Sequence, residues 1–341
     1  MEGERLKVIH YHRKPLPGNF SVENLFRDVR NAFTSEVDVT VVTLPCVSKG
    51  ISNRLKNLWS ISTTSGHINH ITGDVTYIAC RMESRRTICT FLDCVNLDRL
   101  TGLRRWILKK LWFDLPIQRS ALITVISAAT GKRLVELVGC PPEKIRVVHV
   151  PISDGYMASP KPFNGEKPTI LHVGTKHNKN LERHIAALKG LNCRMLIVGE
   201  LSNSQKVLLK ENNIDYTNRF RLSSTEIVRQ YKEADILLFA STYEGFGMPI
   251  VEANAVGRPV ITGNLLSMPE VAGDAAVLVD PFDVESIRTA VLRVINEPEL
   301  RERLVDSGYK NAKRFEANKI AKQFTEIYRE VALNAGLVNG E

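Results

Sequence analysis

Several features that would narrow the function at once are missing from this 341-residue sequence. No apolar run approaches the roughly 20 residues needed to span a bilayer. The N-terminal residues lead straight into a short strand-like run, so no signal peptide is expected. The six cysteines are scattered singly, without the CxxC pairs of a zinc site, and a chain of this size does not need disulfides. These absences predict a cytoplasmic protein with reduced thiols.

Cofactor and metal motifs are missing as well. No GxGxxG follows the first predicted strand, which argues against a nicotinamide dehydrogenase. The nearest match to an Asp-x-Asp box, Glu36-Val-Asp38, is more simply a strand edge. The histidine pairs His10-x-His12 and His67-x-x-His70 lack further clustered ligands. We therefore expect neither a metal nor a cofactor.

The length and the pattern predict two α/β domains. A prior of about 150 residues per domain suggests two, and short β-branched runs alternate with helical patterns, which favours parallel βαβ units. The strands expected in the first half are Lys7–Tyr11, Asp38–Leu44, His70–Ile71 with Val75–Ile78, Thr87–Leu92, Leu122–Ile126 and Ile145–Val150. The helices expected there include Ser21–Phe33, Arg104–Phe113 and Ala128–Val138.

A stretch rich in Pro, Gly and Ser at residues 151–168 predicts a linker, after which a second series begins. Its expected strands are Thr169–Val173, Arg194–Val198, Ile236–Phe239, Pro259–Thr262 and Ala276–Val279. Its expected helices are Asn180–Leu188, Asn203–Asn212, Ser224–Ala234 and Pro249–Val256, followed by a helical tail of Val284–Asn296, Pro298–Arg314 and Ala317–Leu333.

The predicted fold is two Rossmann-like, doubly wound domains that face each other across a cleft. The first covers residues 1–155 and the second residues 156–316, and a C-terminal helix at about 317–341 packs back on the first. In open parallel sheets the ligand sits at the carboxyl ends of the strands.

The excess of positive charge is confined to the first half. Residues 1–150 hold 22 Lys and Arg against 13 Asp and Glu, whereas residues 151–341 hold 24 of each. This asymmetry suggests that the first half faces something anionic. The basic, tryptophan-containing helix at 104–113 suits a membrane surface, but the favoured alternative is that its apolar face is packed core and its charges are solvated. Nucleic acid is disfavoured because no binding motif is found.

The segment after the strand 236–239 has the composition of a phosphate-binding turn. Gly245 and Gly247 allow tight turns and a close approach of the main chain to a ligand. Pro249 suits the first turn of a helix, and the amides of a helix start favour a phosphate. Glu244 and Glu252 flank this turn, so they are candidates to accept hydrogen bonds from hydroxyl groups. A nucleotide-sugar carries both phosphates and hydroxyls.

These residues carry a family resemblance. The segment Ser241-Thr-Tyr-Glu-Gly-Phe-Gly-Met-Pro249 with Glu252 resembles the signature of retaining glycosyltransferase family 4, which has the GT-B fold. The runs 257–262 and 268–281 also resemble that family. The resemblance implies that Glu244 contacts donor-sugar hydroxyls and that Glu252 binds the ribose. It also implies that the loop 245–248 binds the diphosphate. This loop consists of Gly245, Phe246, Gly247 and Met248.

A second resembling element opens the second domain. Gly174 and Lys179 match family positions at the donor diphosphate, whereas Thr175 stands where many members have arginine. Lys176 is either a second cation at the diphosphate or a solvated loop residue.

The resemblance weakens in the first half. Leu92-Asp93 replaces the family's His-Asp pair, so Asp93 is the matched catalytic position. His70 serves either in the cleft or as a buried structural residue. Gly18 either brings its loop to the ligand or makes an ordinary turn.

The resemblance implies a retaining transferase that moves a hexose from a UDP- or GDP-sugar to a polysaccharide or lipid-linked acceptor. Transfer would be metal-independent and front-face, with Glu244, Lys179 and Asp93 at the reaction centre. The first domain would bind the acceptor. Its excess of positive charge, and not the resemblance, suggests peripheral contact with the inner face of a membrane. The alternatives are a nucleotide-sugar epimerase or hydrolase on the same fold and a non-catalytic binding protein.

Overall fold

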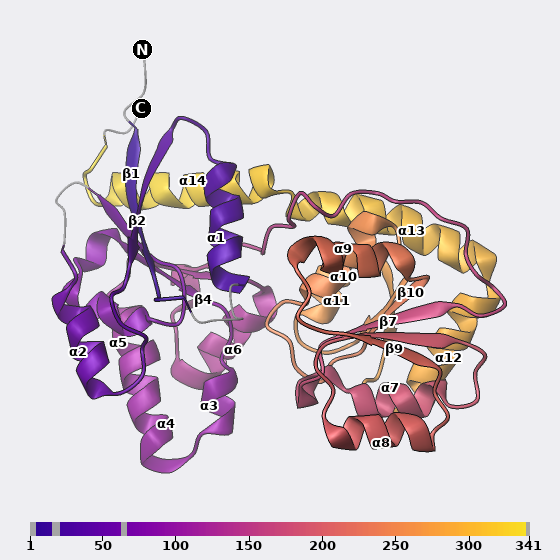
Figure 1. The fold of residues 1–341 in the computed structure, drawn as a ribbon. Coiled ribbons are helices and arrows are strands. Elements are labelled where there is room, and N and C mark those ends of the chain that lie inside the picture. The colour runs from indigo at the N-terminus through magenta and orange to yellow at the C-terminus, as the bar shows by residue number, and fades with distance from the viewer. Residues whose placement is uncertain (1–4, 16–20, 63–66, 339–341) are drawn as a thin grey trace. The chain divides into compact units, whose positions relative to one another are not determined.

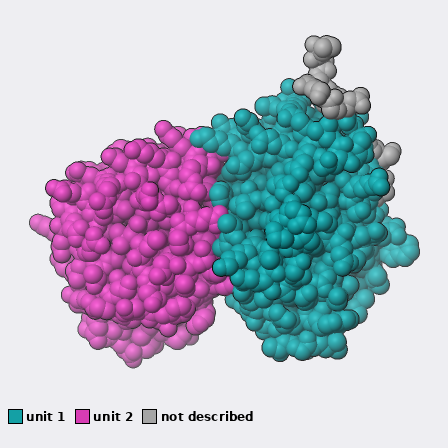
Figure 2. Space-filling model, turned by 180° about the vertical axis from the view of Figure 1, so that it is seen from behind, with its two compact units in different colours: residues 1–151, 317–341 teal, residues 152–316 magenta. Residues whose placement is uncertain are grey.

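The computed structural model describes residues 5–15, 21–62 and 67–338, which form two compact units. Unit 1 comprises residues 1–151 together with 317–341, and unit 2 comprises residues 152–316 (Figure 2). The chain therefore leaves unit 1 near Pro151 and returns to it at Ala317. Each unit is an α/β sandwich built on a six-stranded parallel sheet (Figure 1).

The sheet of unit 1 has the strand order β2-β1-β3-β4-β5-β6. Its strands are β1 (Leu6–His12), β2 (Val37–Thr43), β3 (Ile68–Ile71), β4 (Thr87–Phe91), β5 (Leu122–Val125) and β6 (Ile145–Val147). Its helices are α1 (Ser21–Asn31), α2 (Ile51–Trp59), α3 (Val95–Arg99), α4 (Gly102–Lys109), α5 (Leu115–Gln118), α6 (Ala128–Val138) and α14 (Ala317–Asn334). A π-helical turn at Lys110–Asp114 joins α4 to α5.

The C-terminal helix α14 is part of the core of unit 1. The apolar side chains on its buried face pack with residues of β1, α1 and β3. The Tyr328 hydroxyl lies 2.7 Å from Nδ1 of His70 and 2.9 Å from Nε2 of His10. The other ring nitrogen of His70 meets the Thr90 hydroxyl at 2.7 Å. His70 is thus a buried structural residue, and burial lowers its pKa to about 3.

The sheet of unit 2 has the strand order β12-β11-β10-β7-β8-β9, which is the Rossmann order. Its strands are β7 (Thr169–Val173), β8 (Arg194–Val198), β9 (Tyr216–Arg219), β10 (Ile236–Phe239), β11 (Val260–Gly263) and β12 (Ala276–Val279). The chain winds outward in one direction from β7 and in the other from β10, and these two strands pair directly. The switch point of the sheet therefore lies between β7 and β10.

Helices form two layers around this sheet (Figure 1). One layer holds α7 (Leu181–Leu188), α8 (Asn203–Glu211) and α12 (Val284–Asn296). The other holds α9 (Ser224–Glu233), α10 (Met248–Val256), α11 (Met268–Ala272) and α13 (Pro298–Ala312). The capping boxes Ser202/Gln205 and Ser223/Glu226 start α8 and α9. Helices cover both faces of the sheet, and this explains why its central strands are apolar on both sides.

Most predicted elements are confirmed, and the exceptions have physical causes. Val75–Ile78, predicted as a strand, lies in and beside a 3₁₀ helix (Thr76–Arg81), so that strand prediction is wrong. Val75 and Ile78 are part of the apolar core of unit 1, although they do not belong to its sheet. The single helix predicted at Arg104–Phe113 is α4 followed by the π turn. The helical tail is interrupted by a 3₁₀ turn at Lys313–Phe315.

Two further findings concern the cysteines and the helices of the described residues. All six cysteines are free, as expected, and four of them are buried. Within the ranges that the structure describes, no helix has both the length and the apolar character to cross a bilayer.

Replacing Tyr328 with phenylalanine should destabilise unit 1. The substitution removes one hydroxyl and leaves His10 and His70 without that partner in a dry environment, so a loss of about 1–3 kcal/mol is expected. Urea unfolding measures the change, and Tyr216→Phe in the edge strand β9 is the exposed control. Equal stability of the two variants would contradict the structural role of this hydroxyl.

Candidate functional site

The candidate site lies where β7 and β10 end, at the switch point of unit 2. The loop 174–180 follows β7, and the loop 240–247 follows β10. Thr242 N–H donates to the carbonyl of Asn178 at 2.9 Å, so the two loops are in direct contact. A switch point is where open α/β sheets hold ligands, because the loops there diverge to opposite faces of the sheet.

An ion pair joins the two loops. Lys179 Nζ lies 2.6 Å from Glu244 Oε1, and both side chains are largely buried. Lys179 Nζ also lies 4.8 Å from the centroid of the Phe239 ring. The structure therefore brings together two residues that are 65 positions apart in the sequence.

Gly174 makes room for the stem of Lys179. Its φ of +90° is a left-handed conformation that residues with a side chain rarely adopt. A Cβ placed on Gly174 would lie 2.9 Å from Cγ of Lys179. The glycine therefore allows the lysine to run close to the main chain and reach Glu244.

Two side chains that sequence reasoning missed support the loop after β10. Asn178 donates to the carbonyl of Tyr243 at 2.9 Å. Ser267 Oγ donates to the carbonyl of Phe246 at 2.7 Å and to that of Glu244 at 3.1 Å. Asn178 stands beside Lys179 in the sequence and was overlooked there, whereas Ser267 is too distant in the sequence for any local signal.

The loop after β10 ends in the first turn of α10. Gly247 has a φ of +109° and caps the helix, and Pro249 occupies its first turn. The amides of a helix's first turn have no partner within the helix, and its dipole favours an anion there. Gly245, Phe246 and Gly247 thus lead directly into a helix start, with Met248 as its first residue.

Glu252 lies one turn further along α10 and is held by two tyrosines. Its Oε2 accepts a hydrogen bond from the buried Tyr231, and Tyr156 also donates to its carboxylate. Burial raises the pKa of Glu252 above its ordinary value, while the two phenols and Lys179 oppose that rise. Neither tyrosine stood out in the sequence, because both are distant from the signature segment.

The remaining predicted residues lie apart from this cluster. Lys176 is exposed on the loop after β7. Asp93 belongs to unit 1, where it is exposed at the end of β4 and accepts a hydrogen bond from the Val95 N–H at 3.0 Å. Gly18 lies outside the described residues. Among the described residues, no group of three or more His, Cys, Asp or Glu side chains is arranged to hold a metal ion.

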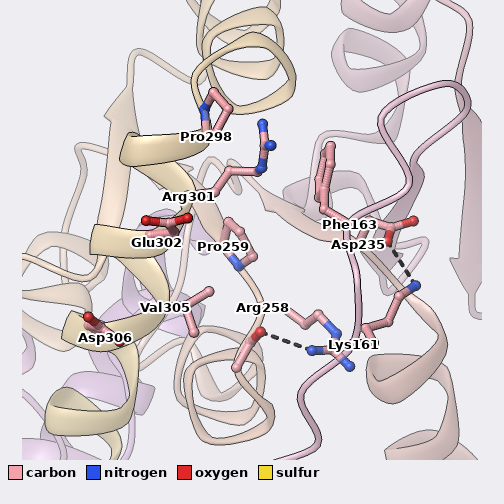
Figure 3. A pocket seen from close by; sticks show the side chains of 11 residues that line it. Lys161, Phe163, Asp235, Arg258, Pro259, Pro298, Arg301, Glu302, Val305 and Asp306 are labelled. Atoms are coloured by element: carbon pink, nitrogen blue, oxygen red, sulfur yellow. Dashed lines mark hydrogen bonds and ion pairs between the residues drawn. The ribbon is translucent and has the colours of Figure 1, made fainter.

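A cavity of about 530 Å³ in unit 2 lies away from these residues (Figure 3). Asp235 and Pro259 line it, and they precede β10 and β11, so it opens at the amino ends of the strands. Its basic groups are engaged: Lys161 pairs with Asp235 at 2.8 Å, and Arg258 donates to five main-chain carbonyls. The cavity therefore does not offer the phosphate chemistry of the opposite sheet edge.

Comparison with known proteins finds a family match in the second half of the chain. Residues 157–311, which contain Gly174, Lys179, Glu244 and Glu252, match the family model described as "Glycosyl transferases group 1". Over this segment the chain is similar to that family. It is 37% identical over 99 residues to the O-antigen chain mannosyltransferase B of Escherichia coli, which covers 29% of this chain and 26% of the relative. The alignments with the curated relatives span 26–53% of those relatives' length.

Solved structures show that the fold is GT-B. A glycosyltransferase from Rickettsia africae superposes with a TM-score of 0.73 at 17% identity, covering 97% of this chain and 99% of that chain. HepE from Anabaena, solved in complex with UDP-glucose, gives a TM-score of 0.74 at 13% identity, covering 96% and 100%. The predicted fold class is therefore confirmed.

The contact between Gly174 and Lys179 predicts a non-additive pair of substitutions. Gly174→Ala should cost the ~1–2 kcal/mol of a left-handed alanine and about 1–3 kcal/mol more for the clash with Lys179. Gly190→Ala is the matched control, because Gly190 has a φ of +76° and nothing within 4 Å of the added Cβ. In a Lys179→Ala background the Gly174→Ala cost should fall to that of the control. Additive free energies of unfolding would contradict the contact.

The raised pKa of Glu252 predicts how stability depends on pH. A carboxyl group whose folded pKa is raised stabilises the fold below its unfolded pKa, and this contribution is lost as pH rises through the folded pKa. Glu252→Gln should therefore be more stable than the parent at pH 8, with a difference that shrinks towards pH 4. Thermal melts across pH measure this. Glu226→Gln is the control and should instead be less stable than the parent at pH 8, because hydrogen bonds from Ser223 lower the pKa of Glu226. A stability difference for Glu252→Gln that does not change with pH would rule this explanation out.

Proposed function

We propose that this protein transfers a hexose from a UDP- or GDP-sugar to a saccharide or lipid-linked saccharide acceptor, with retention of the anomeric configuration. The observation that carries the proposal is the Lys179–Glu244 pair beside the start of α10, at the switch point of unit 2. The family match and the similarity to transferases of known fold support the same chemistry.

Each polar group of the cluster has a role in this proposal. The ammonium group of Lys179 and the amides at the start of α10 bind the diphosphate. The carboxylate of Glu244 accepts hydrogen bonds from sugar hydroxyls, and that of Glu252 accepts them from the ribose. In the free protein Lys179 and Glu244 neutralise each other. When the donor binds, its diphosphate becomes the partner of Lys179 and its sugar hydroxyls become the partners of Glu244. One buried ion pair is thus replaced by two buried interactions with the ligand.

The reaction we propose is a front-face transfer. The glycosidic bond to the diphosphate lengthens through an oxocarbenium-like state, and the departing phosphate oxygen takes the proton from the acceptor hydroxyl on the same face of the sugar. Lys179 and the helix amides stabilise the charge that develops on the diphosphate, so no metal ion is required. Unit 1 binds the acceptor, with Asp93 as its contribution to the reaction centre.

A donor panel with product analysis tests this function. Thermal shifts with UDP, GDP and their sugar conjugates identify the donor, because a ligand that binds only the folded state raises the melting temperature. That donor is then incubated with saccharide acceptors in the presence of EDTA. Transfer with retained configuration supports the proposal. Sugar release or epimerisation without acceptor would replace it with a hydrolase or an epimerase, and binding without turnover would leave only a binding protein.

Lys179→Met should lower kcat by roughly 10²–10³-fold, the effect of losing one charge-stabilising group. Methionine keeps an unbranched apolar stem against Gly174 and removes the ammonium group. Lys176→Met is the matched control on the same loop, and its kcat should stay within about threefold of the parent. Equal effects of the two substitutions would contradict the special position of Lys179.

A further inference from the structure

Two helices of unit 1 expose large apolar side chains to solvent. On α2, Ile51, Leu55 and Trp59 repeat every four residues, and Ile51 and Trp59 are 76% and 77% exposed. The helix α4 has no buried residue at all, and its Leu103 and Trp106 are 71% and 58% exposed. The exposed apolar cluster consists of Ile51, Leu55, Trp59, Leu103, Trp106, Ile107 and Leu111.

The exposed apolar cluster is not the face that attaches these helices to the unit. Other residues do that, since Leu58, Leu108 and Trp112 pack against the core of unit 1. The Arg54 guanidinium lies 4.6 Å from the centroid of the Trp112 ring, which places α2 beside the π turn that continues α4. The sequence left open whether the apolar residues of this segment are core or surface. The structure shows both, on different sides of the same helix.

The part of the chain that carries the exposed apolar cluster is rich in positive charge. Residues 49–119 hold twelve Lys and Arg against five Asp and Glu, which is most of the chain's net charge of +9. Lys49, Lys56 and Arg104 are exposed on or beside the two helices. Asp114 offsets part of this charge, because it pairs with Lys109 at 2.7 Å and with Lys110 at 2.9 Å.

We propose that the exposed apolar cluster docks unit 1 on an anionic lipid bilayer. Aliphatic side chains enter the boundary between headgroups and acyl chains, tryptophans lie at that depth, and basic residues pair with lipid phosphates. Charge argues against a second copy of this chain as the occupant, because two such surfaces would bring their excess positive charge together. Docking does not depend on the proposed sugar transfer.

Vesicle binding of the full chain tests the proposal. Co-sedimentation compares vesicles of phosphatidylcholine containing about one-third phosphatidylglycerol with vesicles of phosphatidylcholine alone. We expect binding to the anionic vesicles only, and weaker binding in about 0.5 M salt, which screens the charges. All three tryptophans belong to α2 or to the α4 segment with its π turn. Their fluorescence should therefore shift to shorter wavelength when vesicles are added.

Matched variants locate the contact. Leu103→Ser/Trp106→Ser should lower the vesicle partition coefficient at least roughly tenfold, because two large apolar side chains are lost. Val207→Ser/Leu278→Ser removes two exposed aliphatic side chains of unit 2 and should leave partition unchanged. The donor-induced thermal shift should be the same in both variants, which separates docking from the proposed catalysis.

Three outcomes would overturn the proposal. They are no binding to anionic vesicles, equal binding by Leu103→Ser/Trp106→Ser and the parent, and a concentration-dependent dimer that this variant abolishes while neither protein binds lipid. The last outcome would assign the exposed apolar cluster to self-association.

Discussion

The buried ion pair between Lys179 and Glu244 is the interaction on which the site depends. The two halves of the unit 2 sheet meet where β7 pairs with β10. Lys179 lies on the loop after β7 and Glu244 on the loop after β10, so their ion pair links the two halves. A largely buried charge is tolerated only when a partner compensates it. Each loop thus fixes the position of the other, and the same two charges are the ones that a phosphorylated, hydroxylated ligand would recruit.

Other parts of the site show a conflict between stability and function. Glu252 is partly buried and accepts hydrogen bonds from two tyrosines, and its burial costs free energy whenever it is ionised. Gly174 and Gly247 adopt left-handed conformations within the two loops. These features weaken the fold locally, and their compensation comes from the apolar core around β7 and β10. Such local violations gathered at one sheet edge are typical of a binding site.

The sequence predicts the parts of the fold that follow a clear period. β7, β8, β10, β12, α6 and α12 match their predicted bounds, because uninterrupted apolar runs or strong helical patterns define them. The edge strand β9 escaped prediction, since its sequence Tyr-Thr-Asn-Arg is polar and it has a partner on one side only. The helices α3, α5 and α11 have only four or five residues each, too few to show a helical period. The nine-residue α2 follows Gly50, which provides no side-chain cap, so its start has no local signal.

The candidate site likewise contains residues that the sequence indicates and residues that only the structure reveals. Glu244, Glu252, Gly174 and Lys179 could be named from the sequence, because each lies in a short segment that resembles the family. Tyr231, Tyr156 and Ser267 could not, since only tertiary contacts bring them to the signature segment. His70 illustrates the limit for a single residue: its role depends on Tyr328, which lies 258 positions away.

Unit 1 is made of two separate segments of the chain, and this affects how the protein folds during synthesis on the ribosome. Unit 2 is one continuous stretch, whereas unit 1 needs α14, which is translated after all of unit 2. Domains generally fold as units during translation. Unit 2 can therefore reach its native state first. Until α14 is made, the strands of unit 1 leave exposed the apolar face that α14 covers in the folded protein. Chaperones that shield nascent chains would have their main task at the N-terminal segment.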